Sequence, residues 1–574
     1  MFQYLKNILI ILSLLFIPLN IYCQYQANTG QIGDKKIAKK YFEYQDFKDA
    51  LKEYLLLLKT DSTNIEYNYQ IGMCYLLTNI DKKKAIPYLE KVTKQSDVNI
   101  FIWYTLGRAY QLAYRFDDAI ISFKKFKTLL GQGYDDNYIT ANRQIQMCYN
   151  AKKMIENPVN VNLENLGPNF NSPYPDYYPF VPEDESFIIF TSKRKGNIGG
   201  LLDYDGFYTS DIYMSELKNC NWKKPKSINT VNSELVEECI GLSQNGENLL
   251  IFADNYIATS EVLSSKKNGK NFQQPITLGK YLKSYMITSA SVTNDNNILF
   301  FASDKQDDNH GGKDIFMSKK LPNGEWGLPD NLGNTINTIY DEDFPNISSD
   351  GKTLYFSSLG HNSMGGFDLF KSLWNEKTKS WSKPVNLGYP INTPDDNYTI
   401  SFSKSGRYAY ISECRENGMG NLDIYRVTFN DAEPKYTPIK GTILNTDSVN
   451  IFLSKLYKTK NDNSYPDIDN NQISVNKFSK SKININKVKK NRKKEIEINI
   501  TVTNKKNNKI IGHYKPNNLT GNYILLLPPG KFTIIYKGKK FQEYKEDIEI
   551  SDYEMDICRQ EIIKNVILTP VIDD

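Results

Sequence analysis

Aspartates recur at one fixed place in the middle of the chain, where a carboxylate could act as a general acid, a general base or a metal ligand. The series consists of Asp211, Asp314, Asp368 and Asp423. A catalytic carboxylate is needed once, whereas these residues return with every unit of a repeat. We therefore interpret the series as structural and predict no catalytic residue in it.

Two histidines in neighbouring units raise the question of a metal site. His310 lies four residues before Asp314, but His361 lies seven residues before Asp368, so their places do not correspond. A zinc ion needs a full set of nitrogen, sulfur or oxygen ligands, and neither a cysteine nor the third histidine is near in the sequence. We predict no metal ion and no cofactor-binding residue.

The run from Gly360 to Gly365 superficially resembles the turn that carries a nucleophilic serine. Its Ser363 stands in the wrong place for the pattern G-x-S-x-G, and the run falls in a predicted hairpin. The sequence also has no H-E-x-x-H motif, no phosphate-binding glycine loop and no plausible triad, and its 3 histidines leave few general bases. We therefore predict that the protein is not an enzyme.

Residues 31–156 repeat with a helical period. Small residues stand 34 and 35 positions apart, and tyrosine, alanine and a large apolar residue follow each of them at matching distances. The small residues are Ala38, Gly72 and Gly107, the alanines are Ala50, Ala85 and Ala119, and the large residues are Tyr54, Leu89 and Phe123. We expect small residues to meet where two antiparallel helices make contact. The pattern resembles the tetratricopeptide repeat, with a last helix over 138–155.

The tetratricopeptide resemblance implies a concave surface that holds a peptide or a partner protein. The alternative is a spacer that positions the regions following it.

Residues 159–430 repeat with a period of about 50–55 residues and have the composition of β-strands. A turn glycine precedes the aspartate of the series by 17 residues, as Gly351 precedes Asp368 and Gly406 precedes Asp423. An aromatic residue then stands three positions before a proline, at Trp222/Pro225, Phe272/Pro275, Trp326/Pro329 and Trp381/Pro384. Short antiparallel strands in such units are typical of a propeller blade. The units resemble the WD40-like PD40 repeat of exported bacterial proteins.

The ends of this region predict a closed ring. The fifth unit stops after Tyr425 without the aromatic, proline and Leu-Gly tail, and residues 165–172 carry that tail before the first unit. We expect residues 159–175 to supply the outer strand of the last blade, which removes an open sheet edge. The result is a five-bladed β-propeller, with six blades as the alternative if a degenerate unit is hidden.

Residues 437–574 begin a new β-rich region. Thr-Gly-x-Tyr at 520–523 and Leu-Pro-Pro-Gly-x-Phe at 527–532 resemble the carboxypeptidase-regulatory-like β-sandwich, which implies a structural or adhesive role. An Asn/Lys-rich insertion over about 458–494 interrupts the region. We interpret this insertion as solvated; contact with acidic lipid or glycan is the alternative.

Residues 1–23 predict a signal peptide, since Lys6 precedes an apolar run too short to span a bilayer comfortably. We expect cleavage after Cys23, with a lipoprotein anchored through Cys23 as the alternative. The remaining cysteines are scattered, and a disulfide between Cys220 and Cys239 stays open. The net charge of +5 is nearly balanced, so we expect no nucleic-acid partner.

The order of these regions, an α-helical repeat followed by all-β domains, is similar to envelope proteins of Bacteroidetes, including the PorE-type accessory of type IX secretion. The resemblance implies an exported, periplasmic protein associated with the outer membrane. An OmpA-like domain that binds peptidoglycan commonly follows in that family, and we expect none here because the chain ends at Asp574.

We therefore predict a non-catalytic scaffold that docks outer-membrane or secretion-machinery proteins through its helical repeats and propeller, as an accessory of type IX secretion or envelope assembly. Peripheral contact with the membrane or cell wall stays open. The alternative is a binder of glycans or peptidoglycan fragments, or an enzyme, with its site at the mouth of the propeller channel.

Overall fold

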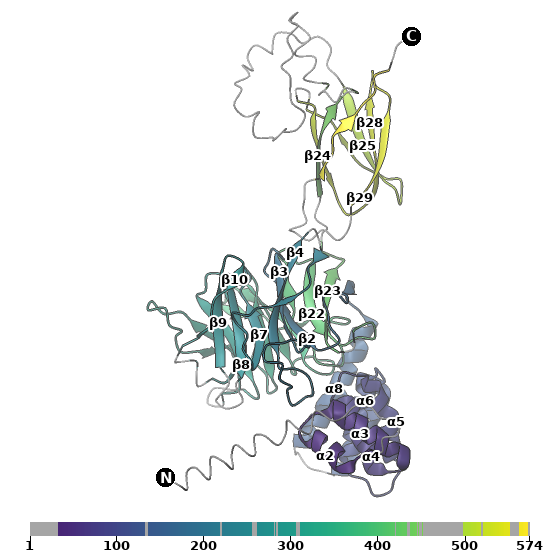
Figure 1. Ribbon diagram of the computed structural model, residues 1–574, viewed down its shortest axis with the longest axis vertical. Helices are drawn as coiled ribbons and strands as arrows, with labels where there is room; N and C mark the ends of the chain where they lie inside the picture. Colours follow the sequence, from purple (N-terminus) through teal and green to yellow (C-terminus); the bar gives the residue numbers. More distant parts are fainter. Residues whose placement is uncertain are drawn as a thin grey trace, which may run out of the picture.

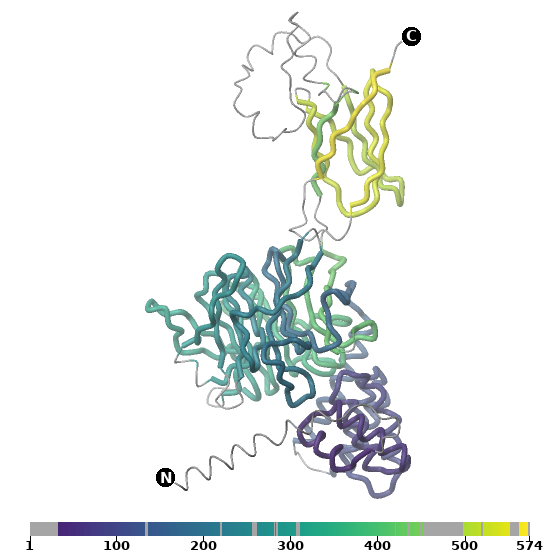
Figure 2. Tube along the Cα trace, viewed as in Figure 1, coloured from purple at the N-terminus to yellow at the C-terminus, as the bar shows by residue number. Residues whose placement is uncertain are grey.

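The computed structural model describes residues 33–131, 136–218, 221–254, 261–279, 282, 285–305, 310–419, 421–432, 437–444, 446, 451, 497–517, 520–550 and 562–571. The predicted signal peptide (1–23) and the predicted insertion (458–494) lie outside these residues. Figure 1 and Figure 2 show the helices at one end of the molecule, the central sheets next to them, and the C-terminal sheets at the other end.

The N-terminal part is a stack of helices joined by short turns. The helices are α2 (Lys35–Glu43), α3 (Phe47–Thr60), α4 (Ile65–Leu76), the 3₁₀ turn η1 (Lys82–Lys84), α5 (Ala85–Val92), α6 (Phe101–Leu112), α7 (Phe116–Leu130) and α8 (Asp136–Glu156). Side chains that accept hydrogen bonds from free N–H groups begin several of them: Asp34 accepts from Lys36 N and Ile37 N, and Asn64 accepts from Tyr67 N.

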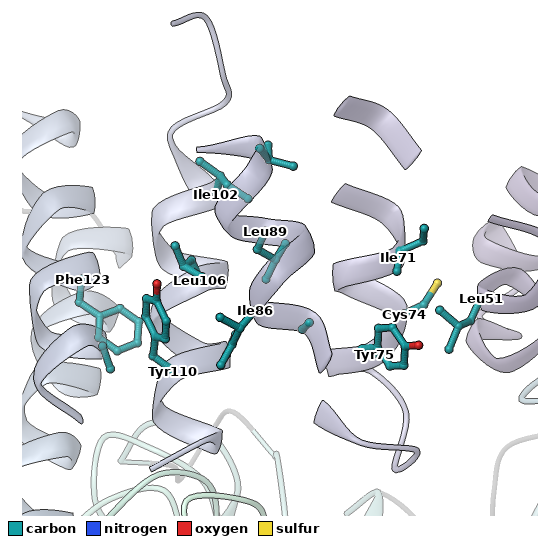
Figure 3. Packing of buried hydrophobic residues seen from close by; sticks show 14 of the residues in the cluster. Leu51, Ile71, Cys74, Tyr75, Ile86, Leu89, Ile102, Leu106, Tyr110 and Phe123 are labelled. Atoms are coloured by element: carbon teal, nitrogen blue, oxygen red, sulfur yellow. The ribbon is translucent and has the colours of Figure 1, made fainter. Parts of the chain in front are cut away.

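The helices approach closely where a glycine on one faces a large residue on the next. A Cβ placed on Gly72 would lie 2.4 Å from Leu89 Cδ2, and one on Gly107 would lie 2.6 Å from Phe123 Cε1. Leu89 and Phe123 belong to the buried cluster shown in Figure 3. The prediction that a small residue of one helix packs against a small residue of the next is therefore wrong in detail, because each glycine packs against a large side chain.

In the part of this region that the structure describes, five antiparallel sheets follow between residues 161 and 429. The first two contain β2 (Asp176–Phe180), β3 (Phe187–Ser192), β4 (Asp211–Lys218), β5 (Asn221–Trp222) and β6 (Lys226–Ser227), then β7 (Val236–Leu242), β8 (Asn248–Asp254), β9 (Glu261–Asn268), β10 (Asn271–Phe272) and β11 (Ile276–Thr277). The next two contain β12 (Ile287–Val292), β13 (Ile298–Ser303), β14 (Asp314–Lys319) and β15 (Asp330–Asn331), then β16 (Glu342–Ile347), β17 (Thr353–Ser358), β18 (Asp368–Asn375), β19 (Ser380–Trp381) and β20 (Val385–Asn386). The fifth contains β21 (Ser401–Phe402), β22 (Tyr408–Glu413), β23 (Asp423–Phe429) and β1 (Val161–Asn165).

The strand β1 closes the fifth sheet. It pairs antiparallel with β23, from Val161 opposite Phe429 to Asn165 opposite Tyr425. This pairing confirms the expectation that residues 159–175 supply a strand to the last unit.

Each sheet shares a hydrophobic core with the next, so the five sheets form a ring. The last of these cores joins the fifth sheet to the first, through Tyr410 and Ile424 on one side and Ile188 and Phe190 on the other. The other cores join the successive sheets in chain order. A ring of antiparallel sheets packed in this way is a β-propeller.

The C-terminal part consists of two sheets over one core. One sheet contains β24 (Thr437–Leu444), β27 (Asn522–Leu527), β30 (Ile562–Ile563) and β31 (Val566–Ile567), and the other contains β25 (Ile498–Asn504), β26 (Ile510–Tyr514), β28 (Gly530–Gly538) and β29 (Tyr544–Ile550). Alternate residues of β27 and β28 point into that core, as Leu525 and Ile534 do.

Candidate functional site

The recurring aspartates each begin a strand and bind the turn before it. Asp368 accepts hydrogen bonds from Met364 N (3.0 Å) and from Asn386 Nδ2 (2.6 Å). The same bonds recur at Asp314, from His310 N and Asn331 Nδ2, and at Asp423, from Met419 N and Asn165 Nδ2. Asp211 accepts instead from Ile198 N and Ser227 Oγ. These contacts agree with a structural role for the series.

Burial makes the carboxyl groups of Asp211 and Asp368 harder to ionise. It raises the pKa of Asp368 to about 8 and that of Asp211 to about 6, and hydrogen bonds to each carboxylate oppose the rise.

A second recurring residue, an asparagine, holds the strand that the aspartate begins. Asn392 accepts from Leu369 N (2.7 Å), donates to Leu369 O (2.9 Å), and donates to Asn386 Oδ1 (2.8 Å). Asn337 and Asn171 make the same three bonds in their sheets. Our reading of the sequence recognised the Leu-Gly pair of this motif but missed the asparagines on either side of it, as in Asn386-Leu387-Gly388 and Asn392.

The two histidines have unrelated roles. His361 lies beside the rings of Phe356 and Phe370, its Nε2 is 2.9 Å from Ile336 O, and burial lowers its pKa. His310 is exposed, and its backbone N–H donates to Asp314. Within the described ranges, no three His, Cys, Asp or Glu side chains are grouped so that they could hold a metal ion.

Ser363 is a buried residue of the turn between β17 and β18. Its Oγ donates to Ser358 O and Gly360 O, at 2.7 Å each. The hydroxyl thus stabilises the turn, as expected for a hairpin.

Aromatic rings from three sheets meet in the centre of the ring. Tyr178 on β2 lies 4.5 Å from Phe344 on β16 and 6.1 Å from Tyr398 before β21, and Phe344 lies 5.5 Å from Tyr398, measured between ring centroids. Tyr178 and Phe344 have positive φ angles of 52° and 49°, at irregularities where their strands shift register. The three rings therefore contact one another although they come from three different sheets.

The helices are fastened to one face of the propeller by an arginine of α8. Arg143 donates from Nε to Leu359 O (3.0 Å), from Nη2 to Gly360 O (2.6 Å) and from Nη1 to His361 O (3.1 Å), and it stacks 4.7 Å over the ring of Tyr340. Burial lowers its pKa, and nearby acidic groups oppose that effect. A planar fork of N–H groups can satisfy several carbonyls of one turn at once.

Two further residues strengthen this contact. Arg108 on α6 donates to Gly365 O (3.1 Å), and Asn150 on α8 donates to Ser363 O (2.9 Å). The turn over 359–365 is therefore enclosed by helical side chains.

The loop after α4 makes a separate contact with the fifth sheet and the loop before it. Lys82 Nζ pairs with Asp395 at 2.6 Å, and Asn79 Nδ2 donates to Asn421 Oδ1 at 3.1 Å. A cavity of about 780 Å³ lies beside this loop. Most of its charged groups are paired with one another, including Lys83 with Glu416.

A smaller cavity of about 300 Å³ lies at the channel mouth beneath the helices. Tyr178 and Tyr398 of the central cluster form part of its wall, and Phe47 of α3 and residues 77–80 cover it. We call this cavity the channel-mouth pocket. It combines residues of the propeller with residues of the helices and of the loop after α4.

Charged groups of the channel-mouth pocket come from α3, from the first two sheets with their loops, and from the segment before β21. Tyr177 Oη donates to Glu238 Oε1 at 2.5 Å, and burial raises the pKa of both residues. Lys193 Nζ lies 2.8 Å from Asp203 and 2.5 Å from Asp205. Burial alone would lower the pKa of Lys193, but the two carboxylates outweigh it and raise the pKa. Sequence reasoning missed this group, because its members share no motif.

The cysteines of the described residues are free thiols. Cys239 is buried on β7, and Cys220, its suggested partner, lies outside the described residues. No helix in the described ranges is both long enough and apolar enough to cross a membrane.

The fold and the site define a class: a helical stack joined to a β-propeller, with a pocket between the two. No family model and no curated protein matches the chain. Solved structures with some likeness include TolB from Acinetobacter baumannii (16% identity, 45% of this chain, 56% of that chain, TM-score 0.29) and a putative TolB from Agrobacterium tumefaciens (13% identity, 48% of this chain, 92% of that chain, TM-score 0.29). Another is the periplasmic gluconolactonase PpgL from Pseudomonas aeruginosa (10% identity, 45% of this chain, 86% of that chain, TM-score 0.26).

Likenesses this weak identify neither an activity nor a partner. The match spans little more than half the length of the first of these proteins.

Proposed function

We propose that this protein is a non-catalytic periplasmic scaffold, associated with the outer membrane, that holds protein partners through its helices and its propeller. In this proposal the helices are tetratricopeptide repeats, the ring is a five-bladed PD40-type propeller, and the C-terminal sheets form a carboxypeptidase-regulatory-like sandwich. Their order is that of Bacteroidetes envelope proteins, including accessories of type IX secretion.

One observation carries the proposal: the helical stack is fixed to the propeller through partly buried polar contacts. Arg143 binds three carbonyls of one turn, and Lys82 pairs with Asp395 at a second place. Two attachment points restrict both rotation and separation of the parts. Two modules that are fixed to each other can present their surfaces to a partner protein at a constant distance and orientation.

The recurring side chains of the propeller support a non-catalytic role. Asp314, Asp368 and Asp423 and their asparagine partners are engaged in hydrogen bonds within their sheets. Residues that form these bonds stabilise their own sheets. In this proposal, a partner protein is therefore bound by the surface of the helices and by the surface between the two modules.

Co-purification from envelope extracts of the source cells, after mild cross-linking, tests the scaffold. We expect a protein partner in constant ratio to the full chain. Ile65 on α4 and Ile139 on α8 are 40% and 43% exposed, and we expect Ile65→Glu with Ile139→Glu to reduce recovery of the partner. Leu373→Glu on β18, where the side chain is 52% exposed, is the matched control on the propeller.

Recovery of the protein alone, in every extract, would contradict the scaffold. Fractionation of the same cells checks the location, and finding the protein in the cytosolic fraction would contradict the periplasmic assignment.

A further inference from the structure

We propose that the channel-mouth pocket binds a small organic ammonium ion. The inference is independent of the scaffold function, because it concerns the channel-mouth pocket and not the outer surface of either module. It rests on the aromatic walls of the pocket, its balance of charge, and two polar atoms with unused bonding capacity.

Aromatic side chains form much of the pocket wall. Tyr177, Tyr178, Tyr398 and Phe207 come from the propeller, and Phe47 comes from α3. The rings of Tyr177 and Tyr178 are inclined at 80°, and those of Tyr178 and Tyr398 at 90°. Because these rings are nearly perpendicular, they form two adjoining walls of the pocket. The electron-rich faces of aromatic rings attract organic cations.

Negative charge exceeds positive charge in the lining. Three carboxylates, of Asp205, Glu238 and Asp396, face two ammonium groups, of Lys48 and Lys193. Lys193 is already held by Asp205 and by Asp203 behind it, and Lys48 lies 4.6 Å over the ring of Phe207. An anion would meet unneutralised carboxylates here, whereas a cation completes the balance.

Two polar atoms of the pocket have capacity to spare. Glu238 uses Oε1 to accept from Tyr177, and its Oε2 has no hydrogen-bond partner within the described ranges. The hydroxyl of Tyr178 likewise has none among the residues that the structure describes. A partly buried carboxylate oxygen without a hydrogen-bond partner attracts a cation, through an N–H group or through charge alone.

The volume and the position of the pocket limit the ligand. About 300 Å³ is at the lower end of the range for small-molecule sites. The pocket is covered by Phe47 and residues 77–80, so a ligand inside it contacts both modules. A free amine and the end of a lysine side chain from another protein share the required chemistry.

Calorimetric titration of the full chain with choline, and with its uncharged isostere 3,3-dimethyl-1-butanol, tests the inference. We expect choline to bind at least about tenfold more tightly, because the two compounds differ in charge and hardly in shape. Nα-acetyl-lysine amide forms a second arm. Tighter binding of this compound than of choline supports the site and assigns the ligand to a protein side chain.

Two variants locate the binding. Glu238→Gln, which keeps the size of the side chain and its bond to Tyr177, is expected to weaken choline binding by about tenfold or more. Glu376→Gln is the matched control, since Glu376 lies on an exposed turn beside Lys379. Thermal unfolding of each variant verifies that it is folded.

Equal binding of choline and its isostere, or no binding of either amine, would overturn the inference. So would unchanged choline binding in the folded Glu238→Gln variant. Binding of a neutral chitotriose in place of choline would also overturn it, and would favour a glycan site in the same pocket.

Discussion

Replacing Arg143 by alanine is expected to loosen the helical stack from the propeller without unfolding either part. Arg143 lies on α8 and donates to the carbonyls of Leu359, Gly360 and His361. The variant removes the whole guanidinium fork, together with its stacking on Tyr340. The turn then loses its polar contact to α8 apart from that of Asn150 with Ser363.

The magnitude follows from the bonds that are lost. A hydrogen bond to a charged group contributes about 1.5–3 kcal/mol, and three acceptors share one guanidinium here. Burial of Arg143, which lowers its pKa, offsets part of this gain. We therefore expect a loss of about 2–4 kcal/mol in the free energy that holds α8 to the turn, or about 30-fold to 1,000-fold in the opening equilibrium.

Hydrogen–deuterium exchange of the full chain measures this opening. Amides of α8 and of the turn over 359–363 should exchange faster by that factor, and amides of β3 and β13 should not change. Arg143→Lys keeps the charge but cannot bridge three carbonyls, so it should behave more like alanine than like the native residue.

Lys152→Ala is the matched control on the same helix. Lys152 pairs with Asp117 at 2.8 Å, its side chain is 40% exposed, and an exposed pair contributes about 1 kcal/mol or less. If Arg143→Ala exchanges no faster than Lys152→Ala, the buried fork does not hold the modules together, and the argument for a fixed platform fails.

Three further predictions concern the interior. Gly107→Ala should lower the free energy of unfolding by about 1–3 kcal/mol in a denaturant titration, because its methyl group would meet Phe123; a neutral result would contradict the close contact. The pKa of Asp368 is raised from 3.8 to about 8, so the native state retains a proton that the unfolded state releases, and stability should fall as pH rises from about 4 to 8. Asp368→Asn should reduce that fall by up to about 1.4 kcal/mol per pH unit, and equal pH dependence of the two proteins would refute the shift. Asn392→Ala should destabilise by about 2–4 kcal/mol in thermal unfolding, and Asn337→Ala by an amount within about 1 kcal/mol of it, since the two residues make the same bonds; very different losses would show that the network is not equivalent.

Periodic features of the fold could be predicted from the sequence because repetition multiplies a weak signal. The strands β14, β18 and β23 begin at aspartates of the recurring series. The pairing of β1 with β23 followed from a tail that the fifth unit lacks. The last helix was expected over 138–155 and runs over 136–156. This difference is no larger than the usual uncertainty in where a helix begins and ends.

The contacts between modules could not be predicted in this way. Arg143 carries no motif, and its partners are backbone carbonyls, which leave no trace in residue type. The prediction that small residues meet between the helices was wrong in detail. The spacing shows which residues share one face of a helix, but it does not show which residue of the neighbouring helix packs against that face.

The channel wall explains why a site can exist in a ring of nearly equal units. One position of each unit, on the inner strand or just before it, is occupied by a different residue in most units; these residues are Tyr177, Glu238, Thr288, Asp343 and Tyr398. The hydrogen-bonded positions beside them repeat, because every unit needs the same bonds to fold. The channel positions differ in residue type, and the bonds that they make between neighbouring units differ with them, as Tyr177 with Glu238 and Thr288 with Asp343. Asp343 is held by Lys313 and Thr288, whereas Glu238 keeps one oxygen for a ligand. Selectivity in a propeller therefore arises at positions whose residues do not repeat from unit to unit. In this protein such positions lie at the channel mouth beneath the helices.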